Sequence, residues 1–292
     1  MRTTSSSIRV RSATPSDAGG ISAIFSDPGF PLTDPAECAI WTNHRLLEGF
    51  LTDVALMGRR IVGHAQWIVS DEPAPYGRHL YLGMIDVHPK VRGRGAGRAL
   101  IEAGIEHARS LSCPLVKTLS EKDARGFYAK CGFARMGRIV RGSIKRRRAA
   151  LPTGWRRART VPREVVRALP MRLGWAQACS AHMWSICNRP IRLAGEAPSE
   201  HPCARRVDGK AYVQLRYCPQ AGPAALGIAW APRAVRLETL CAVAMALARD
   251  LPVEKLTLIT ELSDRVELAS CCDDEPQTGP DDEIWSRPVE PA

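Results

Sequence analysis

The sequence predicts a mixed α/β fold whose set of strands and helices occurs twice along the 292 residues. Three observations support this prediction. Apolar segments with the two-residue period of strands alternate with segments of helical period. A glycine-rich run joins a strand to a helix in the first half of the chain. Several residues of the first half recur in the second half at a nearly constant offset.

The first half is predicted to begin with a strand at residues 8–11, followed by a short helix. Thr14 supplies an N-cap for this helix, and a proline and an acidic residue follow in its first turn. Strand-like runs at residues 53–57 and 61–69 are separated by a glycine turn, so we expect them to form a hairpin.

A fourth strand is predicted at residues 80–87, directly before the glycine-rich run. A helix leaves the run at residues 97–110, then a buried strand follows at residues 115–119 and a short helix at residues 124–131. Gly132 is a typical C-terminal stop for the last helix. Three- and four-residue spacing predicts that the longer helix buries Leu100, Ala103, Gly104, His107 and Leu111.

The run from Val87 to Gly97 has the features of an anion-binding turn. Gly95 and Gly97 permit close approach of the backbone to a ligand. The next helix offers unpaired N–H groups and a partial positive charge, to which Arg92 and Arg94 add full charges. Neither the P-loop pattern nor the dinucleotide-binding pattern fits the run. An ordinary strand-to-helix turn is the alternative interpretation.

The order of elements and two motifs together resemble the GNAT acyltransferase superfamily. The first motif is RGRGAG, from Arg92 to Gly97, and the second is DARGFYAKCGF, from Asp123 to Phe133. The resemblance covers residues 8–144. It implies a mixed, mostly antiparallel sheet that splays between its fourth and fifth strands, with an acyl-CoA, taken as acetyl-CoA, in the split.

The resemblance also implies which residues hold the cofactor. Backbone N–H groups of the glycine-rich run are expected to bind the pyrophosphate, and they belong to Arg92, Gly93, Arg94, Gly95, Ala96 and Gly97. Backbone groups of Ile85 and Val87 are expected to pair with the pantetheine arm. Asp123 is also expected at the cofactor, although the family often has asparagine there.

Acyl transfer to an amine needs one group that accepts the amine proton and another that protonates the departing sulfur. Tyr128 aligns with the family's tyrosine and is the expected acid, since a phenol with a pKa near 10 stays protonated at neutral pH. It is also expected to contact the cofactor; a packed aromatic beside Phe127 is the alternative. His79 and Asp86 are the candidate bases, and a chain of waters is the alternative to both.

The second half is predicted to be a second copy of the same fold. Matching residues of the two halves are separated by 144 residues at first and by 140 residues further along the chain. Two copies of one fold that differ by small insertions would produce such a slow change. The recurring residues are Leu82 and Gly83 with Leu226 and Gly227, Pro89 with Pro232, and Arg125, Ala129 and Cys131 with Arg265, Ala269 and Cys271. We therefore predict a catalytic acyl-CoA-binding domain at residues 1–148 and a degenerate GNAT-like domain at residues 149–292.

The predicted elements of the second half follow the order of the first half. Strands are expected at residues 155–161, 204–207, 211–218, 226–230 and 253–259, and helices after Pro162, at residues 175–187 and at residues 237–248. Residues 233–238 contain no glycine, Glu238 places a carboxylate near the helix start, and Leu268 replaces the tyrosine. We expect this copy not to bind CoA and instead to shape the substrate pocket or pack as a pseudo-dimer partner.

Charge is distributed unevenly within a net charge of +11. Basic residues crowd the junction between the halves: Arg138, Arg141, Lys145, Arg146, Arg147, Arg148, Arg156, Arg157 and Arg159. Acidic residues gather near the C-terminus: Asp273, Asp274, Glu275, Asp281, Asp282 and Glu283. The basic strip is typical of a solvated linker that acidic residues partly neutralise, and it is also compatible with binding to RNA.

The ten cysteines are scattered without a C-x-x-C pair, which favours reduced thiols and predicts no metal site. No apolar run reaches the length of a membrane-spanning helix, and no secretory signal is visible, so a cytoplasmic protein is expected.

The sequence therefore favours an enzyme that moves an acetyl group from CoA to a small-molecule or peptide amine by direct attack in a ternary complex. Two other interpretations stay open. One is a non-catalytic acyl-CoA-binding regulatory protein, and the other is an acetyltransferase that acts on RNA-linked amines through the basic junction. A pseudo-dimer within the chain is compatible with a monomer.

Overall fold

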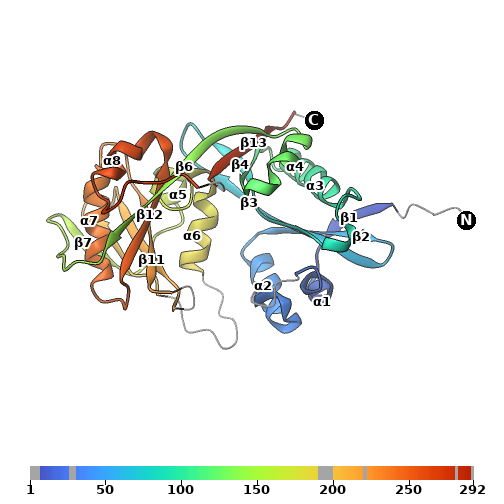
Figure 1. The fold of residues 1–292 in the computed structure, drawn as a ribbon, viewed down its shortest axis with the longest axis horizontal. Coiled ribbons are helices and arrows are strands. Elements are labelled where there is room, and N and C mark those ends of the chain that lie inside the picture. The colour runs from blue at the N-terminus through green and yellow to red at the C-terminus, as the bar shows by residue number, and fades with distance from the viewer. Residues whose placement is uncertain (1–6, 26–30, 190–199, 220–221, 280–281, 291–292) are drawn as a thin grey trace, which may run out of the picture.

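The computed structural model describes residues 7–25, 31–189, 200–219, 222–279 and 282–290. Within these residues, thirteen strands form one sheet with the order β1-β2-β3-β4-β5-β13-β6-β12-β11-β10-β9-β7, and β8 pairs with β11 off this path. Figure 1 shows α1 to α4 around one half of the sheet and α5 to α8 around the other half.

The predicted elements of the first half are confirmed, and β6 and α2 are present in addition, although the sequence did not predict them. Its strands are β1 (Ile8–Ser12), β2 (Leu51–Met57), β3 (Arg60–Asp71), β4 (Arg78–Val87), β5 (Leu115–Ser120) and β6 (Ala134–Lys145). Its helices are α1 (Ala18–Ser22), α2 (Pro35–Leu47), α3 (Ala96–Ser110) and α4 (Arg125–Lys130). The expected cap before α1 is also present, since Thr14 and Asp17 form a capping box.

The second half contains the predicted elements, two strands that the sequence did not predict, and the short helix α8, which it also did not predict. Its strands are β7 (Trp155–Ala158), β8 (Met171–Leu173), β9 (Cys203–Arg206), β10 (Tyr212–Tyr217), β11 (Ala224–Trp230), β12 (Lys255–Glu261) and β13 (Glu283–Pro288). Its helices are α5 (Val165–Ala168), α6 (Ser180–Asn188), α7 (Leu237–Ala248) and α8 (Arg265–Ala269). The additional strands are β8 and β13.

Both halves contain a pair of parallel strands that separate at the same relative position. β4 and β5 pair only as far as Leu82 and Thr118. β11 and β12 pair only as far as Gly227 and Leu258. The recurring Leu-Gly pair therefore marks the point of separation in each copy, and the predicted tandem of mostly antiparallel, splayed sheets is confirmed.

The two copies exchange strands. β13, from the C-terminal end of the chain, lies between β5 and β6 and is antiparallel to both. β6 pairs with β13 through residues 134–138 and with β12 through residues 139–145. A domain boundary between residues 148 and 149 therefore does not divide the sheet into two. The predicted domain boundaries stay a prediction.

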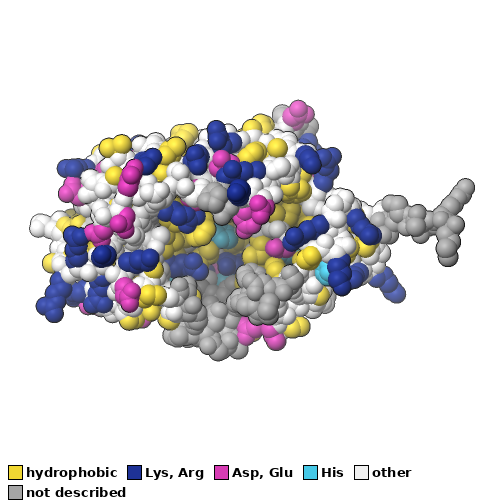
Figure 2. Space-filling view, in the orientation of Figure 1, with side chains coloured by type: hydrophobic (Ala, Val, Ile, Leu, Met, Phe, Trp, Pro, Cys, Tyr) yellow, Lys and Arg dark blue, Asp and Glu magenta, His cyan; other side chains and the backbone are white. Residues whose placement is uncertain are grey.

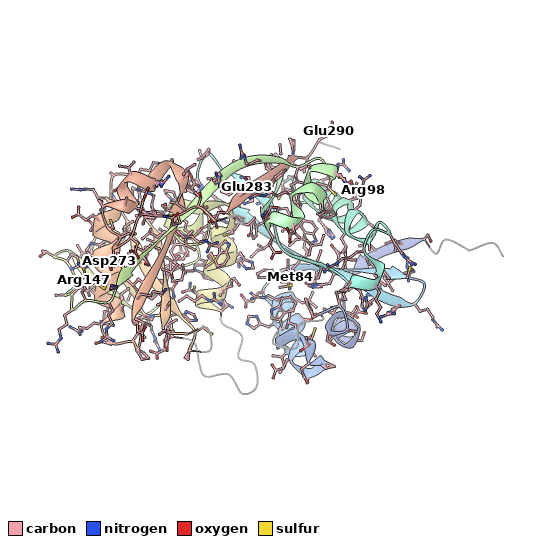
Figure 3. All side chains as sticks on the ribbon, viewed as in Figure 1. Met84, Arg98, Arg147, Asp273, Glu283 and Glu290 are labelled. Atoms are coloured by element: carbon pink, nitrogen blue, oxygen red, sulfur yellow. The ribbon has the colours of Figure 1, made fainter. Side chains whose placement is uncertain are left out.

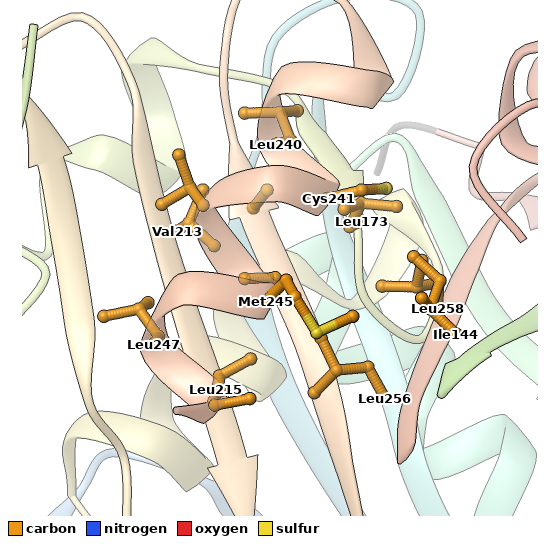
Figure 4. Packing of buried hydrophobic residues seen from close by; sticks show 14 of the residues in the cluster. Ile144, Leu173, Val213, Leu215, Leu240, Cys241, Met245, Leu247, Leu256 and Leu258 are labelled. Carbon is orange, nitrogen blue, oxygen red and sulfur yellow. The ribbon is translucent and has the colours of Figure 1, made fainter. Parts of the chain in front are cut away.

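Apolar clusters on both sides of the sheet form the core. Figure 4 shows the cluster around α7, which includes Leu240 and Met245 packed over Leu256 and Leu258. On the other half, α3 packs its apolar face against β2, β3 and β4. No helix within the described ranges is long and apolar enough to span a membrane.

The predicted buried face of α3 is partly wrong. Leu100 and Gly104 are buried, but Ile101, Ile105 and Ala108 complete the buried face. Ala103 is half-buried, and His107 lies at the rim, where its Nε2 is 2.9 Å from a carboxylate oxygen of Asp53. Gly104 is needed because Trp67 lies directly against it, so that an added Cβ would be 2.2 Å from the indole ring. This contact fixes the rotation of the helix.

Side chains of the first half also cap α6 of the second half. The Glu72 carboxylate accepts hydrogen bonds from the Ser70 hydroxyl at 2.6 Å and from the Ser180 N–H at 3.0 Å. The Ser70 hydroxyl oxygen accepts one from the Ala181 N–H at 3.4 Å. Because the first N–H groups of a helix lack partners within the helix, these contacts fix α6 against the end of β3.

Candidate active site

A cavity of about 920 Å³ occupies the split between β4 and β5. Its lining comes from the segment after α1, β4, the glycine-rich run, the start of α3, β5 and α4. Figure 3 labels two of the lining residues, Met84 on β4 and Arg98 in the first turn of α3. The cavity is therefore continuous from the glycine-rich run to the face of β4 that carries Met84.

The glycine-rich run folds as an open turn at the N-terminus of α3. Gly93 and Gly95 have φ angles of 79° and 91°, in the left-handed region that disfavours other residues. A Cβ at Gly97 would lie 3.1 Å from the Phe127 ring, so glycine is also needed there for close packing. Arg92, Gly93, Gly95, Ala96 and Gly97 line the cavity, whereas Arg94 does not.

The run can bind an anion through its backbone and side chains. The first turn of α3 presents N–H groups without helical acceptors toward this end of the cavity. Arg92 is exposed, and its Nε donates to the Val87 carbonyl at 3.2 Å, which holds the guanidinium beside the run. The geometry fits a diphosphate and makes the ordinary-turn interpretation the weaker one.

Residues after Gly83 provide a strand edge beside the cavity. Gly83 is an extra residue in the pairing of β3 with β4, because Gln66 pairs with Met84 while Trp67 pairs with Leu82. Past this bulge, β4 has no pairing with β5. Ile85 and Val87, the residues predicted to hold the pantetheine arm, both line the cavity.

Tyr128 lies in the cavity wall and is also packed in the core. Its ring centroid is 5.2 Å from that of Phe127 and 5.5 Å from that of Phe133. Burial raises the pKa of Tyr128 to about 12, against the opposing effect of a hydrogen bond with Thr118. The phenol therefore stays protonated at neutral pH, as an acid requires.

Asp86 lines the same cavity from the opposite face of β4 to Ile85 and Val87. It stands beside His64 in the pairing of β3 with β4, and His64 contacts the Trp41 ring of α2. Burial and the nearby charge of Glu121 raise the pKa of Asp86 to about 6, while Arg92 lowers it. Most molecules therefore carry an ionised Asp86 at neutral pH, which suits a base.

The structure places His79, one of the two candidate bases, away from the cavity. Its Nδ1 lies 2.9 Å from the Gly77 carbonyl oxygen, and its Nε2 lies 2.7 Å from the Ala178 carbonyl oxygen in the second half. His79 is fully buried outside the cavity, about 13 Å along the strand from Gly83. Its ring joins the two halves instead of serving the cavity.

Several lining residues were not predicted. Asp123 lines the cavity as expected, and beside it lie Glu121, Thr118, Arg98 and Met84. Glu121 matters for chemistry because its charge raises the pKa values of both Asp86 and Tyr128. Glu121 lies three residues after Thr118, the last residue of β5 that pairs with β4, and no sequence motif marks this position.

The second split, between β11 and β12, is bridged by the chain itself. β8 pairs with β11 at Ala229 and Trp230, beyond the last parallel pair. From the end of β8, the Gly174 N–H donates to the Ile259 carbonyl of β12 at 2.9 Å. Both strand edges that would face a ligand in this split are thus already hydrogen-bonded.

A buried arginine completes this bridge. Arg172 is 5% exposed and donates to the carbonyls of Arg233 and Val235, each at 3.2 Å. It also pairs with Asp264 at 3.3 Å and with Glu267 at 3.1 Å. Glu267 in turn accepts a hydrogen bond from the Leu237 N–H, at the first residue of α7. The N-terminus of α7 is therefore occupied by a side chain of the protein.

The carboxylate at this helix start is not the one that the sequence predicted. Glu238 points to the surface, where it pairs with Arg236 at 2.8 Å, and both side chains are largely exposed. Leu268, which stands where the first copy has Tyr128, is fully buried in the core. The second copy thus lacks both the open helix start and the phenol.

Acidic residues of the C-terminal segment neutralise part of the basic junction. Figure 3 shows Arg147 beside Asp273, and these two side chains form an ion pair. Arg141 pairs with Asp282 at 2.7 Å. Asp281 lies outside the described residues. These pairs match the interpretation of a partly neutralised strip, and RNA binding stays a prediction.

The ten cysteines are all free thiols, as expected. In the parts of the chain that the structure describes, no group of histidine, cysteine and acidic side chains is arranged to hold a metal ion.

Comparisons with known proteins agree with this geometry. Residues 21–133 match the model of the acetyltransferase (GNAT) family. Glucosamine 6-phosphate N-acetyltransferase 1 of Oryza sativa subsp. japonica is 30% identical over 113 residues, which cover 36% of this chain and 67% of that protein.

Solved structures extend the likeness to both halves. A putative acetyltransferase from Pyrococcus horikoshii has a TM-score of 0.60 at 15% identity, covering 98% of this chain and 91% of its own. A tandem GNAT protein from the clavulanic acid biosynthesis pathway has a TM-score of 0.58 at 17% identity, covering 98% of this chain and all (100%) of its own. At these identities the likeness concerns the fold.

Proposed function

Because this chain belongs to the acetyltransferase (GNAT) family and is an N-acetyltransferase, we propose that it transfers the acetyl group of acetyl-CoA to a primary amine by direct attack. The observation that carries the proposal is the open split between β4 and β5, which continues into the glycine-rich run at the start of α3. Its volume of about 920 Å³ is near the upper end of the usual range for ligand pockets.

The residues of the split fit the parts of acetyl-CoA. Backbone N–H groups at residues 92–97 and the Arg92 guanidinium suit the pyrophosphate. The edge of β4 beyond Gly83 suits the extended pantetheine arm, because it lacks a partner strand there. Asp123 also lines the cavity, and its exposed carboxylate can reach a polar group of the cofactor.

In the proposed reaction, the amine nitrogen attacks the thioester carbonyl carbon, the carbon–sulfur bond breaks, and the sulfur leaves as a thiolate that takes up a proton. Asp86 accepts the proton that the amine loses, since its pKa of about 6 leaves it ionised at neutral pH. Tyr128 donates the proton to the sulfur, since its pKa of about 12 keeps it protonated. The two groups stand on different elements around one cavity.

The second half does not bind CoA in this proposal. β8 and Arg172 occupy the strand edges and the helix start that correspond to the cofactor site of the first half. One working site per chain follows.

Thiol release from acetyl-CoA, followed with a panel of primary amines, tests the proposed transfer. The rice relative is named for glucosamine 6-phosphate, so that amine belongs in the panel with amino acids, peptides and polyamines. We expect release with at least one amine and its loss in Gly95→Glu, because the new carboxylate repels the pyrophosphate by several kcal/mol.

Gly209→Glu is the matched control for this variant. Gly209 has a φ of 73° and open space around it, as Gly95 does, but it lies in the turn between β9 and β10. The control should keep its activity. Thiol release that is equal in the two variants, or that no amine elicits in the unchanged protein, would contradict the proposal.

A further inference from the structure

At the junction of the two halves, two nitrogens of a buried arginine of α2 have no hydrogen-bond partner among the described residues. Arg45 is 8% exposed, and its Nε and Nη1 atoms are buried without a partner among the described residues. The guanidinium carbon lies 4.8 Å from the Phe50 ring centroid and 5.9 Å from that of Trp41. An ionised group that is buried in this way is unfavourable unless a ligand of opposite charge completes its surroundings.

Among the described residues, the surroundings of Arg45 carry a surplus of positive charge. Arg216 of β10 is half-buried, and it has no ion pair within the described ranges. Its charge acts on Arg45, His182 and His201, so these groups of both halves lie within electrostatic reach of one another. Glu48 is the acidic residue that acts on Arg45, and it is already paired with Arg189 at 3.1 Å.

His182 of α6 connects this charge with the acyl cavity. A Cβ at Gly83 would lie 3.1 Å from both Nδ1 and Cε1 of His182, and Gly83 lines the cavity. The ring centroids of His182 and Phe50 are 5.8 Å apart, and the Arg45 guanidinium lies over the face of the Phe50 ring. His182 Nδ1 is also buried without a partner. The capping of α6 by Ser70 and Glu72 fixes these distances.

The junction is hollow on one face of the molecule. Figure 2 shows a depression between the two halves, with hydrophobic, Lys or Arg, and histidine side chains inside it. Met84, which lines the cavity together with Asp86, lies near the middle of the molecule between the two halves (Figure 3). An acceptor amine that enters this depression contacts residues of both halves.

We propose that Arg45 and Arg216 bind a carboxylate or phosphate group of the acceptor, so that the acceptor is an anionic amine whose amino group lies on the Gly83 side of His182. Guanidinium groups suit this task because they bind both anions through paired hydrogen bonds. The inference rests on the proposed acetyl transfer. It assigns to the second half, through Arg216 and His182, a direct part in acceptor recognition.

Direct binding tests the anion site without turnover. Glucosamine 6-phosphate, alanine and inorganic phosphate should each change the tryptophan fluorescence saturably, because Trp41 lies beside Arg45. The counterparts without the anionic group, glucosamine and alaninamide, should bind at least about tenfold more weakly, and raised salt should weaken only the ligands that carry a phosphate or carboxylate. Equal affinity for the members with and without the anionic group in both pairs would overturn the inference.

Variants locate the site. Arg45→Gln and Arg216→Gln should each weaken binding of the preferred anion by about tenfold or more, and Arg45→Lys should restore part of it. Arg249→Gln is the control, because Arg249 pairs with the adjacent Asp250 at the surface. If Arg45→Gln does not fold, Arg216→Gln carries the test alone. Unchanged anion affinity in a folded Arg216→Gln protein would overturn the assignment.

Thiol-release kinetics separate this inference from the proposed function. With turnover, both variants should raise the KM of the acceptor that carries the phosphate or carboxylate more than that of its counterpart without this group. Anion binding that the variants weaken, in a protein that releases no thiol with any amine, would contradict the transfer reaction and leave the anion site supported. Turnover that prefers the counterparts without the anionic group would contradict the anion site and leave the transfer reaction supported.

Discussion

Asp86 and Tyr128 share one cavity, and burial raises the pKa of both. The values nevertheless fall on opposite sides of neutral pH, at about 6 and about 12, because a carboxyl and a phenol start from different ordinary values. A base that is ionised and an acid that is protonated therefore coexist at pH 7. This is the arrangement that proton transfer in two directions requires.

The pH dependence of kcat should report Asp86. Its carboxylate is active when ionised, so kcat should rise with pH through an ionisation near 6 and then level. Asp86→Asn should remove this limb and lower kcat by roughly 100-fold or more. Glu121→Gln should shift the limb to lower pH, because the charge of Glu121 raises the pKa of Asp86. A limb that persists unchanged in Asp86→Asn would assign the base to another group.

Tyr128→Phe tests the acid. The ring contacts with Phe127 and Phe133 should survive, so acetyl-CoA should still bind in a calorimetric titration. Loss of the proton donor should lower kcat by roughly 100-fold, measured as thiol release with a saturating amine. A reduction of less than about threefold would leave Tyr128 as a packing residue only.

Residue types in local patterns made much of the site predictable. Glycines, arginines and the start of α3 lie next to one another in sequence, so the anion-binding turn could be recognised before the fold was known. Arg45 and His182 could not be recognised in this way. Each lies on a helix without a distinguishing motif, and they come together through the packing of α6 against β3, where Ser70 and Glu72 cap α6.

Strands β8 and β13 show the corresponding limit for elements. β8 has only three residues, and β13 ends in a proline, so neither has the alternation typical of an independent strand. β8 becomes a strand because it pairs with the edge of β11, and β13 becomes a strand because it pairs with the edges of β5 and β6. These partner strands are distant from β8 and β13 in the sequence. Longer elements such as the amphipathic α3 and the largely buried β3 carry their own signal and were predicted.

The bridge in the second split should contribute to stability. Arg172→Met removes a buried guanidinium and leaves Asp264 and Glu267 without that partner, so the free energy of unfolding should fall by about 3 kcal/mol. Arg236→Met is the control, since its pair with Glu238 is largely exposed and should contribute at most about 1 kcal/mol. Urea denaturation measures both. Equal losses would contradict a structural role for Arg172.

Strand exchange predicts that the whole molecule unfolds as one unit. β13 comes from the second half of the chain but pairs with β5 of the first half, and its Ile284 is fully buried there. Ile284→Ala should lower the free energy of unfolding by about 2–5 kcal/mol and should shift one common transition. Leu47→Ala, at a side chain that is largely exposed, should change it by less than about 0.5 kcal/mol. Separate transitions for the two halves, with only one shifted, would contradict the coupling.

The number of acetyl-CoA molecules bound per chain tests the central claim most directly. The first split is open and carries the glycine-rich run, whereas the second is bridged by β8 and Arg172. Isothermal titration of the full chain with acetyl-CoA should therefore give one site per chain, and the Gly95→Glu protein should give none. Two sites per chain, or one site that persists in Gly95→Glu, would contradict the account.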